Sequence, residues 1–299
     1  MSCAAAGRAT SRIFISHSKN IFANLAFEEF LFRTGRHPHA LLLWSNRPCV
    51  VIGRHQNPWL ESHVEEIERR GVDFARRHSG GGTVYHDLGN LNISFLTPHE
   101  EHCRTRNLKF IVGAVADRLG IQLESTSRDD ILLNGKKVSG TAARISKGRS
   151  YHHLTLLVDT DREAMHTLLH SPLEESITTN ATRSTRAMAG VGCLRDSQPL
   201  LTVPRLQEAL LAAYRKCFTE CETEEVDVDN LLIEAPEVAA VHDELIDWSW
   251  RFGKTPKFQV AGLSVENGCI ADSPDKAQLG HRFQPALLRK GMEASRAAI

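Results

Sequence analysis

Residues 76–90 read RRHSGGGTVYHDLGN, and the chain is best interpreted outward from this stretch. Three successive glycines separate two segments with strand-like alternation. Glycine reaches backbone conformations closed to other residues, so neighbouring N–H groups can converge on one point and bind a phosphate or carboxylate. Arg76 and Arg77 adjoin the glycines and could pair with such an anion. A flexible connector is the alternative, but the ordered alternation after the glycines disfavours it.

Strands and helices are predicted on both sides of this glycine loop. Asn20 caps a helix to about Phe32, and Asn57-Pro58 begins another that runs to about Arg70. Asn134-Gly135 is the strongest hairpin signal. Further strands are predicted at 40–45 and 49–53 (around the turn 46–48), 72–77, 83–87 and 90–96, a second hairpin at 147–148, and helices at 108–119, 161–169 and 203–218. Strands joined mostly by hairpins predict an α+β domain with a mixed, largely antiparallel sheet. The glycine loop is neither a Walker A loop nor a Rossmann fingerprint.

The composition excludes several classes of protein. The 299 residues hold 36 Lys+Arg and 36 Asp+Glu, so the net charge is zero, which argues against a general nucleic-acid binder. No apolar run approaches the roughly 20 residues that span a bilayer. The seven cysteines form no C-x-x-C pair and predict reduced thiols, and the histidines form no metal-binding motif. We therefore expect no nucleic acid, membrane or metal as a partner.

Charge is segregated along the chain. Residues 220–247 carry eleven acids and no Lys or Arg, which predicts a solvated acidic connector. Residues 101–150 hold ten bases against five acids, so a positive site is expected in the first domain. We therefore predict a catalytic domain at 13–219, the connector at 220–247 and a small tail domain at 248–299. Residues 1–12 have the composition of a short mitochondrial targeting segment, and equally of a start that happens to lack acids.

A second chemical constellation lies in the hairpin around Asn134-Gly135. Successive strand residues alternate faces, so Lys136 and Lys137 point to opposite sides and Lys137 shares its side with Ser139. An inward ammonium could neutralise a phosphate or stabilise charge on an acyl oxygen. The alternative is a pair of solvated hairpin lysines. On the next predicted strand, His152 and His153 are as typical of a core or sheet edge as of a ligand site.

Three segments together resemble one family. Residues 77–90 resemble the signature of lipoate–protein ligases and lipoyltransferases, and VIGRHQNPW at 51–59 is similar to their ligand-pocket segment. KVSGTA at 137–142, followed by YHHLTL at 151–156, resembles their catalytic-lysine hairpin. The order and separation of the three segments agree with those of the family, and the resemblance runs from about residue 13 to 260. The segment HQNPW at 55–59 is most similar to the corresponding segment of the animal mitochondrial lipoyltransferases.

The resemblance implies a fold like that of biotin ligases and class II synthetases, with a small accessory domain. It implies transfer of a lipoyl group from lipoyl-AMP, the substrate, to a lysine of lipoyl domains in 2-oxo acid dehydrogenase acyltransferase subunits and of the glycine cleavage H protein. It further implies a monomer in the mitochondrial matrix, with Lys137 as the catalytic residue. The residues implied to bind lipoyl-AMP are Arg77, Ser79, Gly80, Gly81, Gly82, Thr83, Val84, Tyr85, His86, Asp87, Asn90, Arg128, Lys137, Gly140, Thr141, Thr155, Thr182 and Arg183.

Other functions stay open at this point. A complete ligase would also make lipoyl-AMP from lipoate and ATP with Mg²⁺, and a non-catalytic lipoyl-domain binder would keep the same fold. Octanoyl transfer implies a cysteine nucleophile, and the residues after the Lys137 hairpin offer none. One departure concerns the tail: after residues 257–260 the family continues with a hairpin of long strands, so the domain at 248–299 is expected to be atypically short.

Overall fold

The computed structural model describes residues 10–185 and 190–288. Its main body is built on a six-stranded mixed sheet with the strand order β10-β11-β6-β2-β1-β13. The β2-β6, β6-β11 and β10-β11 pairs are antiparallel, and the β1-β2 and β1-β13 pairs are parallel. The strands are β1 (Thr10–Ser16), β2 (Ala40–Trp44), β6 (Asn90–Pro98), β10 (Ser139–Ser146), β11 (Arg149–Leu157) and β13 (Glu220–Val226). The expected α+β fold with a mixed sheet is confirmed.

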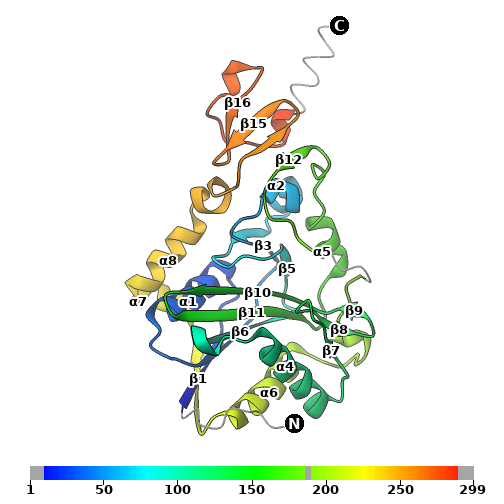
Figure 1. The fold of residues 1–299 in the computed structure, drawn as a ribbon, viewed down its shortest axis with the longest axis vertical. Helices are drawn as coiled ribbons and strands as arrows, with labels where there is room; N and C mark the ends of the chain where they lie inside the picture. The colour runs from blue at the N-terminus through cyan, green and yellow to red at the C-terminus, as the bar shows by residue number, and fades with distance from the viewer. Residues whose placement is uncertain (1–9, 186–189, 289–299) are drawn as a thin grey trace.

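Helices cover both faces of this sheet because its central strands are apolar on both sides. Leu41 and Leu43 of β2 pack with helices α4 (Arg104–Leu119) and α6 (Val203–Tyr214). Leu42 and Trp44 face the other way, toward α1 (Ile21–Thr34), α7 (Val228–Glu234) and α8 (Pro236–Ile246). Figure 1 shows α4 and α6 below the sheet. The alternation of buried side chains therefore makes a three-layer body.

Smaller sheets extend the body. One has the order β4-β3-β5, with β3 (Cys49–Ile52), β4 (Asp73–Arg76) and β5 (Val84–His86). A second joins β7 (Glu124–Ser125), β8 (Ile131–Leu133) and β9 (Lys136–Lys137). Although β2 and β3 were predicted around one turn, they enter different sheets. The glycine loop thus connects two strands, β4 and β5, that both pair with β3.

A third small sheet lies at the far end of the molecule (Figure 1), with the order β12-β14-β15-β16. β14 (Phe258–Val260), β15 (Leu263–Glu266) and β16 (Cys269–Asp272) come from the predicted tail domain. β12 (Ile177–Thr179) comes from the first domain and pairs with β14. The apolar side chains of this sheet share a core with Trp59 and Phe74. The tail is therefore packed onto the main body through a shared sheet and a shared core.

Several local predictions are confirmed. Asn20 caps α1, accepting hydrogen bonds from the backbone N–H groups of Phe22 and Ala23. The turn at Asn134-Gly135 has positive φ at both residues and links β8 to β9. The second hairpin turns at residues 147–148 between β10 and β11.

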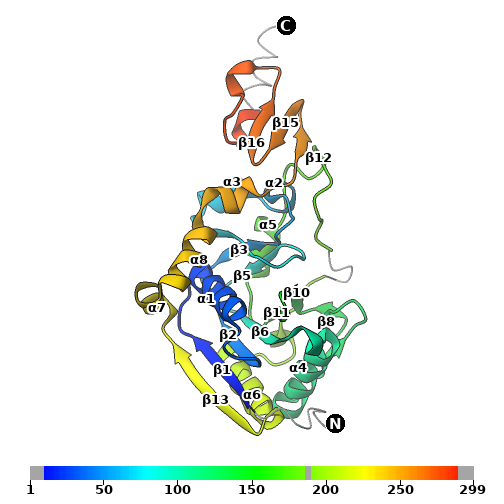
Figure 2. The same cartoon turned by 60° about the vertical axis from the view of Figure 1, so that its left-hand side comes forward.

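Two predictions are corrected. The helix expected from Pro58 to Arg70 is two helices, α2 (Pro58–Glu61) and α3 (Val64–Arg69), because Ser62 is extended and its hydroxyl bonds the carbonyl of Pro58. The acidic segment 220–247 is not a solvated connector. Its first part forms the sheet-edge strand β13 beside β1 (Figure 2), and α7 and α8 pack their apolar faces into the core that they share with α1.

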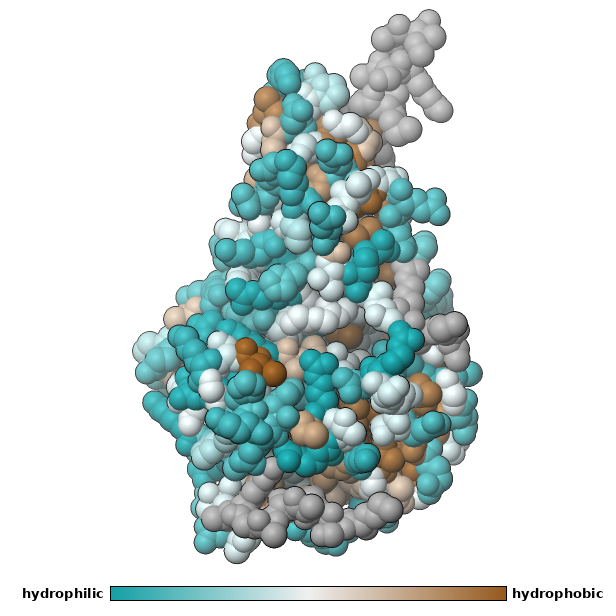
Figure 3. Space-filling view, in the orientation of Figure 1, coloured by the Kyte–Doolittle hydropathy of each residue, from teal (hydrophilic) through white to brown (hydrophobic). Residues whose placement is uncertain are grey.

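The start of β1 at Thr10 places residues 10–12 in the sheet, while the rest of the predicted targeting segment lies outside the described residues. Among the described helices, none is both long and apolar enough to cross a bilayer. On the face drawn in Figure 3, hydrophilic residues dominate and hydrophobic ones form small separate groups.

The remaining described helices are short. α5 (Arg162–Leu168) follows β11 and is capped by Asp161, whose carboxylate accepts from two backbone N–H groups. 3₁₀ turns occur at His99–Glu101, Leu194–Asp196, Arg215–Cys217 and Lys276–Gln278, and a π-helical turn at Ser249–Gly253.

Candidate functional site

A cavity of about 790 Å³ separates the glycine loop from the Lys137 hairpin. Three stretches far apart in the sequence form its walls: 81–85, 137–141 and 182–185. Of the residues expected to bind a ligand, the structure brings these to the lining: Gly81, Gly82, Thr83, Val84, Tyr85, Arg128, Lys137, Gly140, Thr141, Thr155, Thr182 and Arg183. Their shared position makes this cavity the candidate active site, and their individual roles stay predictions.

The lining of the cavity carries an excess of positive charge. Five Arg or Lys side chains line it against three acids: Arg104, Arg128, Lys137, Arg162 and Arg183 against Glu61, Asp129 and Asp130. The positive site expected in the first domain is present although the whole chain is neutral. A cleft with an excess of one sign concentrates oppositely charged ligands, so this cavity favours an anion.

Lys137 projects into the cavity, whereas Lys136 is exposed to solvent. The two side chains point in opposite directions because successive residues of β9 alternate faces, and this confirms the predicted orientation of the two lysines. The ammonium of Lys137 lies 2.5 Å from a carboxylate oxygen of Asp130, and its side chain is 21% exposed. The backbone N–H of Lys137 donates to the carbonyl of Gly190, which ties the hairpin to the segment beyond β12. The charged end is thus positioned but still accessible from the cavity.

Arg77 organises the glycine loop from behind. Its guanidinium donates to the carbonyls of Val51, Gly80 and Gly82 and to the hydroxyl of Ser79, at 2.6–3.1 Å. Burial lowers the pKa of Arg77 to about 10. Because its donors are engaged by the loop, Arg77 shapes the walls of the site.

Arg76, also expected to meet an anion, faces away from the larger cavity. It is completely buried and donates to the carbonyls of Gly53, Arg54, Gln56, Trp250 and Arg251 and to the hydroxyl of Thr255. Carbonyl oxygens from two separated segments therefore surround this cation. The expectation that Arg76 pairs with an anion is corrected: it joins the glycine loop to the π-helical turn.

A buried polar chain continues from the loop into the sheet. The hydroxyl of Ser79 lies 2.9 Å from Nε2 of His153, and Nδ1 of His153 lies 3.0 Å from a carboxylate oxygen of Glu28. All three side chains are buried. Since Ser79 also accepts from Arg77, its hydroxyl hydrogen is available for His153. Ser79 therefore holds the loop against β11, and His153 is one of the residues lining a smaller cavity.

The remaining predicted residues support the loop rather than line the larger cavity. Nδ1 of His86 lies 3.0 Å from the amide nitrogen of Asn46, and burial lowers the pKa of His86 to about 3. The carboxylate of Asp87 accepts from the N–H groups of Gly89 and Asp161, and burial raises its pKa. Asn90 is completely buried and donates to Asn92. Gly80 is held by Arg77 through its carbonyl.

A strap formed by residues 182–185 lies over the glycine loop. The hydroxyl of Ser184 accepts from the N–H of Thr83 at 2.8 Å and from the amide of Gln56 at 3.0 Å. The carboxylate of Glu61 accepts from the N–H of Ser184 and lies 3.3 Å from Arg183. The strap and the loop therefore form one connected wall.

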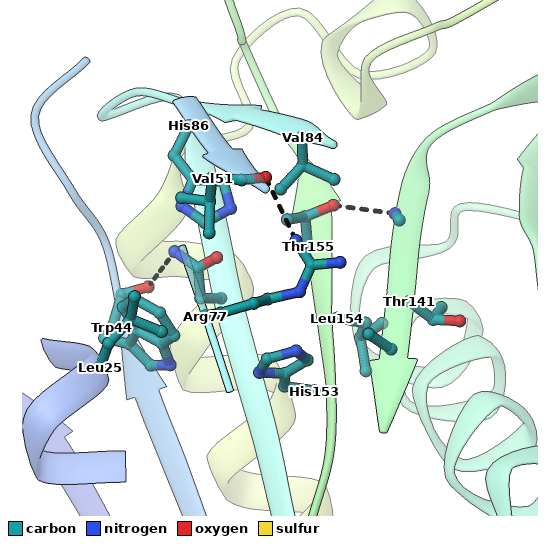
Figure 4. A pocket seen from close by; sticks show the side chains of 13 residues that line it. Leu25, Trp44, Val51, Arg77, Val84, His86, Thr141, His153, Leu154 and Thr155 are labelled. Atoms are coloured by element: carbon teal, nitrogen blue, oxygen red, sulfur yellow. Dashed lines mark hydrogen bonds between the residues drawn. The ribbon is translucent and has the colours of Figure 1, made fainter. Parts of the chain in front are cut away.

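A smaller, largely apolar cavity of about 30 Å³ adjoins the first (Figure 4). Leu25, Trp44, Val51 and Leu154 give it apolar walls, and Arg77, His86 and His153 reach it from the polar side. It shares four residues with the larger cavity, Val84, Gly140, Thr141 and Thr155. The N–H of Gly140 donates to the Thr155 hydroxyl at this boundary. The two cavities are therefore neighbours, one charged and one apolar.

Some residues that line or support the larger cavity were not among the predicted site residues. Gln56, Glu61 and Ser184 hold the loop or the strap, and Asp130 meets Lys137. His166 and His170 of the α5 region also line the cavity. Two of these residues had a signal in the sequence: Gln56 lies in the segment similar to the family's ligand pocket, and Asp130 lies two residues after Arg128, just before the strongest hairpin signal. Within the described residues, no group of three or more His, Cys, Asp or Glu side chains could hold a metal ion.

Comparison with known proteins identifies relatives of this chain. The family model described as "Lipoyl protein ligase A/B catalytic domain" matches residues 20–215. The human mitochondrial lipoyl amidotransferase LIPT1 is 39% identical over 260 residues, covering 83% of this chain and 67% of the relative. Lipoate-protein ligase A of Psychrobacter cryohalolentis is 36% identical and covers 83% of this chain and 74% of the relative.

Among solved structures, P. falciparum LipL1 in complex with lipoate superimposes with a TM-score of 0.71. It is 26% identical and covers 88% of this chain and 83% of that one. The matched family region contains the glycine loop, the Lys137 hairpin and the strap, so the site and the sequence similarity fall on the same part of the fold.

Proposed function

We propose that this chain, which belongs to the family of lipoyl protein ligase A/B catalytic domains, moves the lipoyl group from lipoyl-AMP to one lysine of an acceptor protein. It is a lipoyltransferase of that family. The observation that carries this proposal is the positively lined cavity in which the glycine loop, the Lys137 hairpin and the strap meet. Its charge suits a nucleotide phosphate, and its neighbour suits an acyl tail.

The chemistry requires little beyond position and charge. Lipoyl-AMP is a mixed anhydride and is already activated, and the acceptor lysine supplies the nucleophile. The enzyme must hold the two reactants together and stabilise charge on the acyl oxygen and the departing phosphate. We assign that electrostatic role to Lys137, because its ammonium lies in the cavity and is partly exposed there. The backbone of the glycine loop and the strap residues Thr182 and Arg183 would surround the nucleotide.

The apolar neighbour is our candidate for the dithiolane end of the lipoyl group. Val51 and Val84 are among the apolar side chains that line it. At about 30 Å³ the cavity is too small for a whole lipoyl chain, so the chain must cross the boundary residues Val84, Gly140, Thr141 and Thr155. Side chains such as Leu25 and Trp44 must also move aside to admit the ring.

The test is single-turnover transfer. The purified chain is mixed with synthetic lipoyl-AMP and an apo-lipoyl domain, and the mass of the acceptor is measured by mass spectrometry. We expect the gain of one lipoyl group, with release of AMP. If the acceptor binds without gaining mass, the chain is a non-catalytic lipoyl-domain binder.

A parallel incubation replaces lipoyl-AMP with lipoate, ATP and Mg²⁺. We expect no AMP or pyrophosphate in this arm, because we propose a transferase that receives its substrate preactivated. Production of both would make the chain a complete ligase, the second candidate, which the similarity to a bacterial lipoate-protein ligase A favours.

We propose lipoyl domains of 2-oxo acid dehydrogenase acyltransferase subunits and the glycine cleavage H protein as acceptors, and the mitochondrial matrix as the location. The human relative is named as mitochondrial, which supports that compartment. Competition between the two acceptor types in one reaction, and protease protection of the tagged chain in isolated mitochondria, test these two proposals.

A further inference from the structure

The ammonium of Lys137 is neutralised by a specific partner. Its Nζ lies 2.5 Å from Oδ1 of Asp130, and both side chains are about a quarter exposed or less, at 21% and 26%. Both residues line the large cavity. Since Lys137 is needed at the acyl phosphate, binding of that anion must compete with Asp130 for the ammonium. The carboxylate is then left facing the cavity without its cation.

The backbone around Asp130 fixes this carboxylate in place. The Thr126 hydroxyl accepts from the N–H groups of Arg128 and Asp130, and the Thr126 N–H donates to the carbonyl of Asp130. Asp129 has a φ of 63°, and its carboxylate pairs with Arg104 at 3.2 Å. The two consecutive acids therefore have separate partners, and only Asp130 is directed at Lys137.

The acceptor lysine is almost entirely protonated at neutral pH and so cannot attack. A free lysine amine has a pKa near 10.4, so only about one in a thousand is neutral at pH 7.4. The ammonium must lose a proton before its nitrogen can attack. Of the three acids that line the cavity within the described residues, Glu61 bonds the strap and Asp129 bonds Arg104. Asp130 is the acid whose partner leaves when substrate binds.

We propose that Asp130 is a catalytic residue that receives the acceptor ammonium and removes its proton. This inference rests on the proposed function. One N–H bond of the acceptor breaks, and its proton passes to the Asp130 carboxylate. The freed electron pair forms the C–N bond to the lipoyl carbonyl carbon. The bond from that carbon to the phosphate oxygen breaks, and its electron pair leaves with AMP, which takes the second nitrogen proton.

The charged groups around this step are spread over the whole lining. Lys137 faces Asp130 from β9, and Arg128 and Asp129 directly precede it in sequence. The other titratable or charged residues of the cavity are Arg104, Arg162, His166, His170, Arg183, Tyr85 and Glu61. Because several charged groups share the cavity, the test compares two nucleophiles on the same variant rather than one rate at one pH.

The experiment uses the full chain loaded with synthetic lipoyl-AMP. At pH 7.4 it is offered either an apo-lipoyl domain or hydroxylamine, which is unprotonated at this pH and needs no base. For Asp130→Asn we expect transfer to the lysine to fall about 100-fold, while hydroxylamine cleaves the bound mixed anhydride within about threefold of the wild-type rate. The rate at which Asp130→Asn transfers the lipoyl group to lysine should rise about tenfold per pH unit between pH 7 and 9. Asp130→Glu should recover part of the wild-type rate of transfer to lysine.

Asp129→Asn is the matched control, because asparagine tolerates the positive φ and the Lys137 pair is untouched. Its ratio of the two rates should equal that of the wild type. The inference is overturned if Asp130→Asn transfers to lysine as fast as the wild type, or if it loses both reactions equally, which would mean that Asp130 only holds Lys137. Failure of the loaded wild type to modify the lysine would instead overturn the proposed function and this inference with it.

Discussion

The carbonyl oxygen of Gly82 lies 2.6 Å from Nη2 of Arg77, and the same nitrogen lies 2.6 Å from the carbonyl of Gly80. One buried cation thus fixes two of the three glycines of the loop. Carbonyls turned inward to Arg77 leave the opposite side of the loop to face the cavity. The shape of this cavity wall therefore depends on a side chain on its far side.

Arg77→Lys should collapse this arrangement while keeping the charge. An ammonium cannot reproduce the planar fork that reaches Val51, Gly80 and Gly82 together. We expect the free energy of unfolding to fall by about 2–4 kcal/mol, because buried hydrogen bonds to a charged group are lost. Urea melts measure this change. Arg69→Lys, at an exposed arginine paired with Glu66, is the control and should leave the urea midpoint unchanged.

Gly53→Ala should disturb the loop without removing any polar group. A Cβ at Gly53 would lie 2.2 Å from the carbonyl oxygen of Gly81, a backbone atom that cannot rotate away. We expect the transfer rate to fall about 100-fold, since displacements of this size misplace a bound reactant. Gly113→Ala in α4 is the matched control, because nothing lies within 4 Å of its Cβ position. It should be fully active and more stable by about 0.5–1 kcal/mol. Full activity of Gly53→Ala would show that the loop does not hold the reactant.

Lys137→Ala should abolish most of the transfer from synthetic lipoyl-AMP. Removing a positive group directed at developing charge costs about 10²–10³ in rate. The neighbouring Lys136→Ala removes an identical side chain that is exposed to solvent, and its rate should match the wild type. Single-turnover kinetics separate this effect from binding. If Lys137→Ala keeps most of its activity, Lys137 is not central to the mechanism.

The sequence predicted the features whose causes are local. The Asn20 cap, the Asn134-Gly135 turn and the alternation that exposes Lys136 and directs Lys137 inward each depend on a few adjacent residues. The resemblance to the family then predicted that the glycine loop and the Lys137 hairpin form one site. Pairings over long distances were not predictable. β13 pairs with β1 about 210 residues away in the sequence, and its many acids hid an edge strand.

The role of Arg76 was missed for the same reason. Arg76 and Arg77 stand beside the glycines in sequence, but Arg76 is surrounded by carbonyls of residues 53–56 and 250–251. Nothing local distinguishes an arginine that meets a ligand from one that meets the backbone. Ser184 was missed because its partners Gln56 and Thr83 lie more than 100 residues upstream.

His152, one of two buried histidines of β11, should make the stability of the protein depend on pH. Burial lowers the pKa of His152 to about 3, whereas an unfolded histidine titrates near 6.5. Between these values the unfolded chain binds one more proton at this position, so stability is lost as the pH falls below 6.5. For His152→Gln we expect the slope of unfolding free energy against pH, between pH 6 and 4, to be smaller by up to about 1.4 kcal/mol per pH unit. Urea melts at several pH values measure both slopes, with His281→Gln as the control for removal of an exposed imidazole. Equal slopes for the wild type and His152→Gln would show that His152 is protonated in the folded protein.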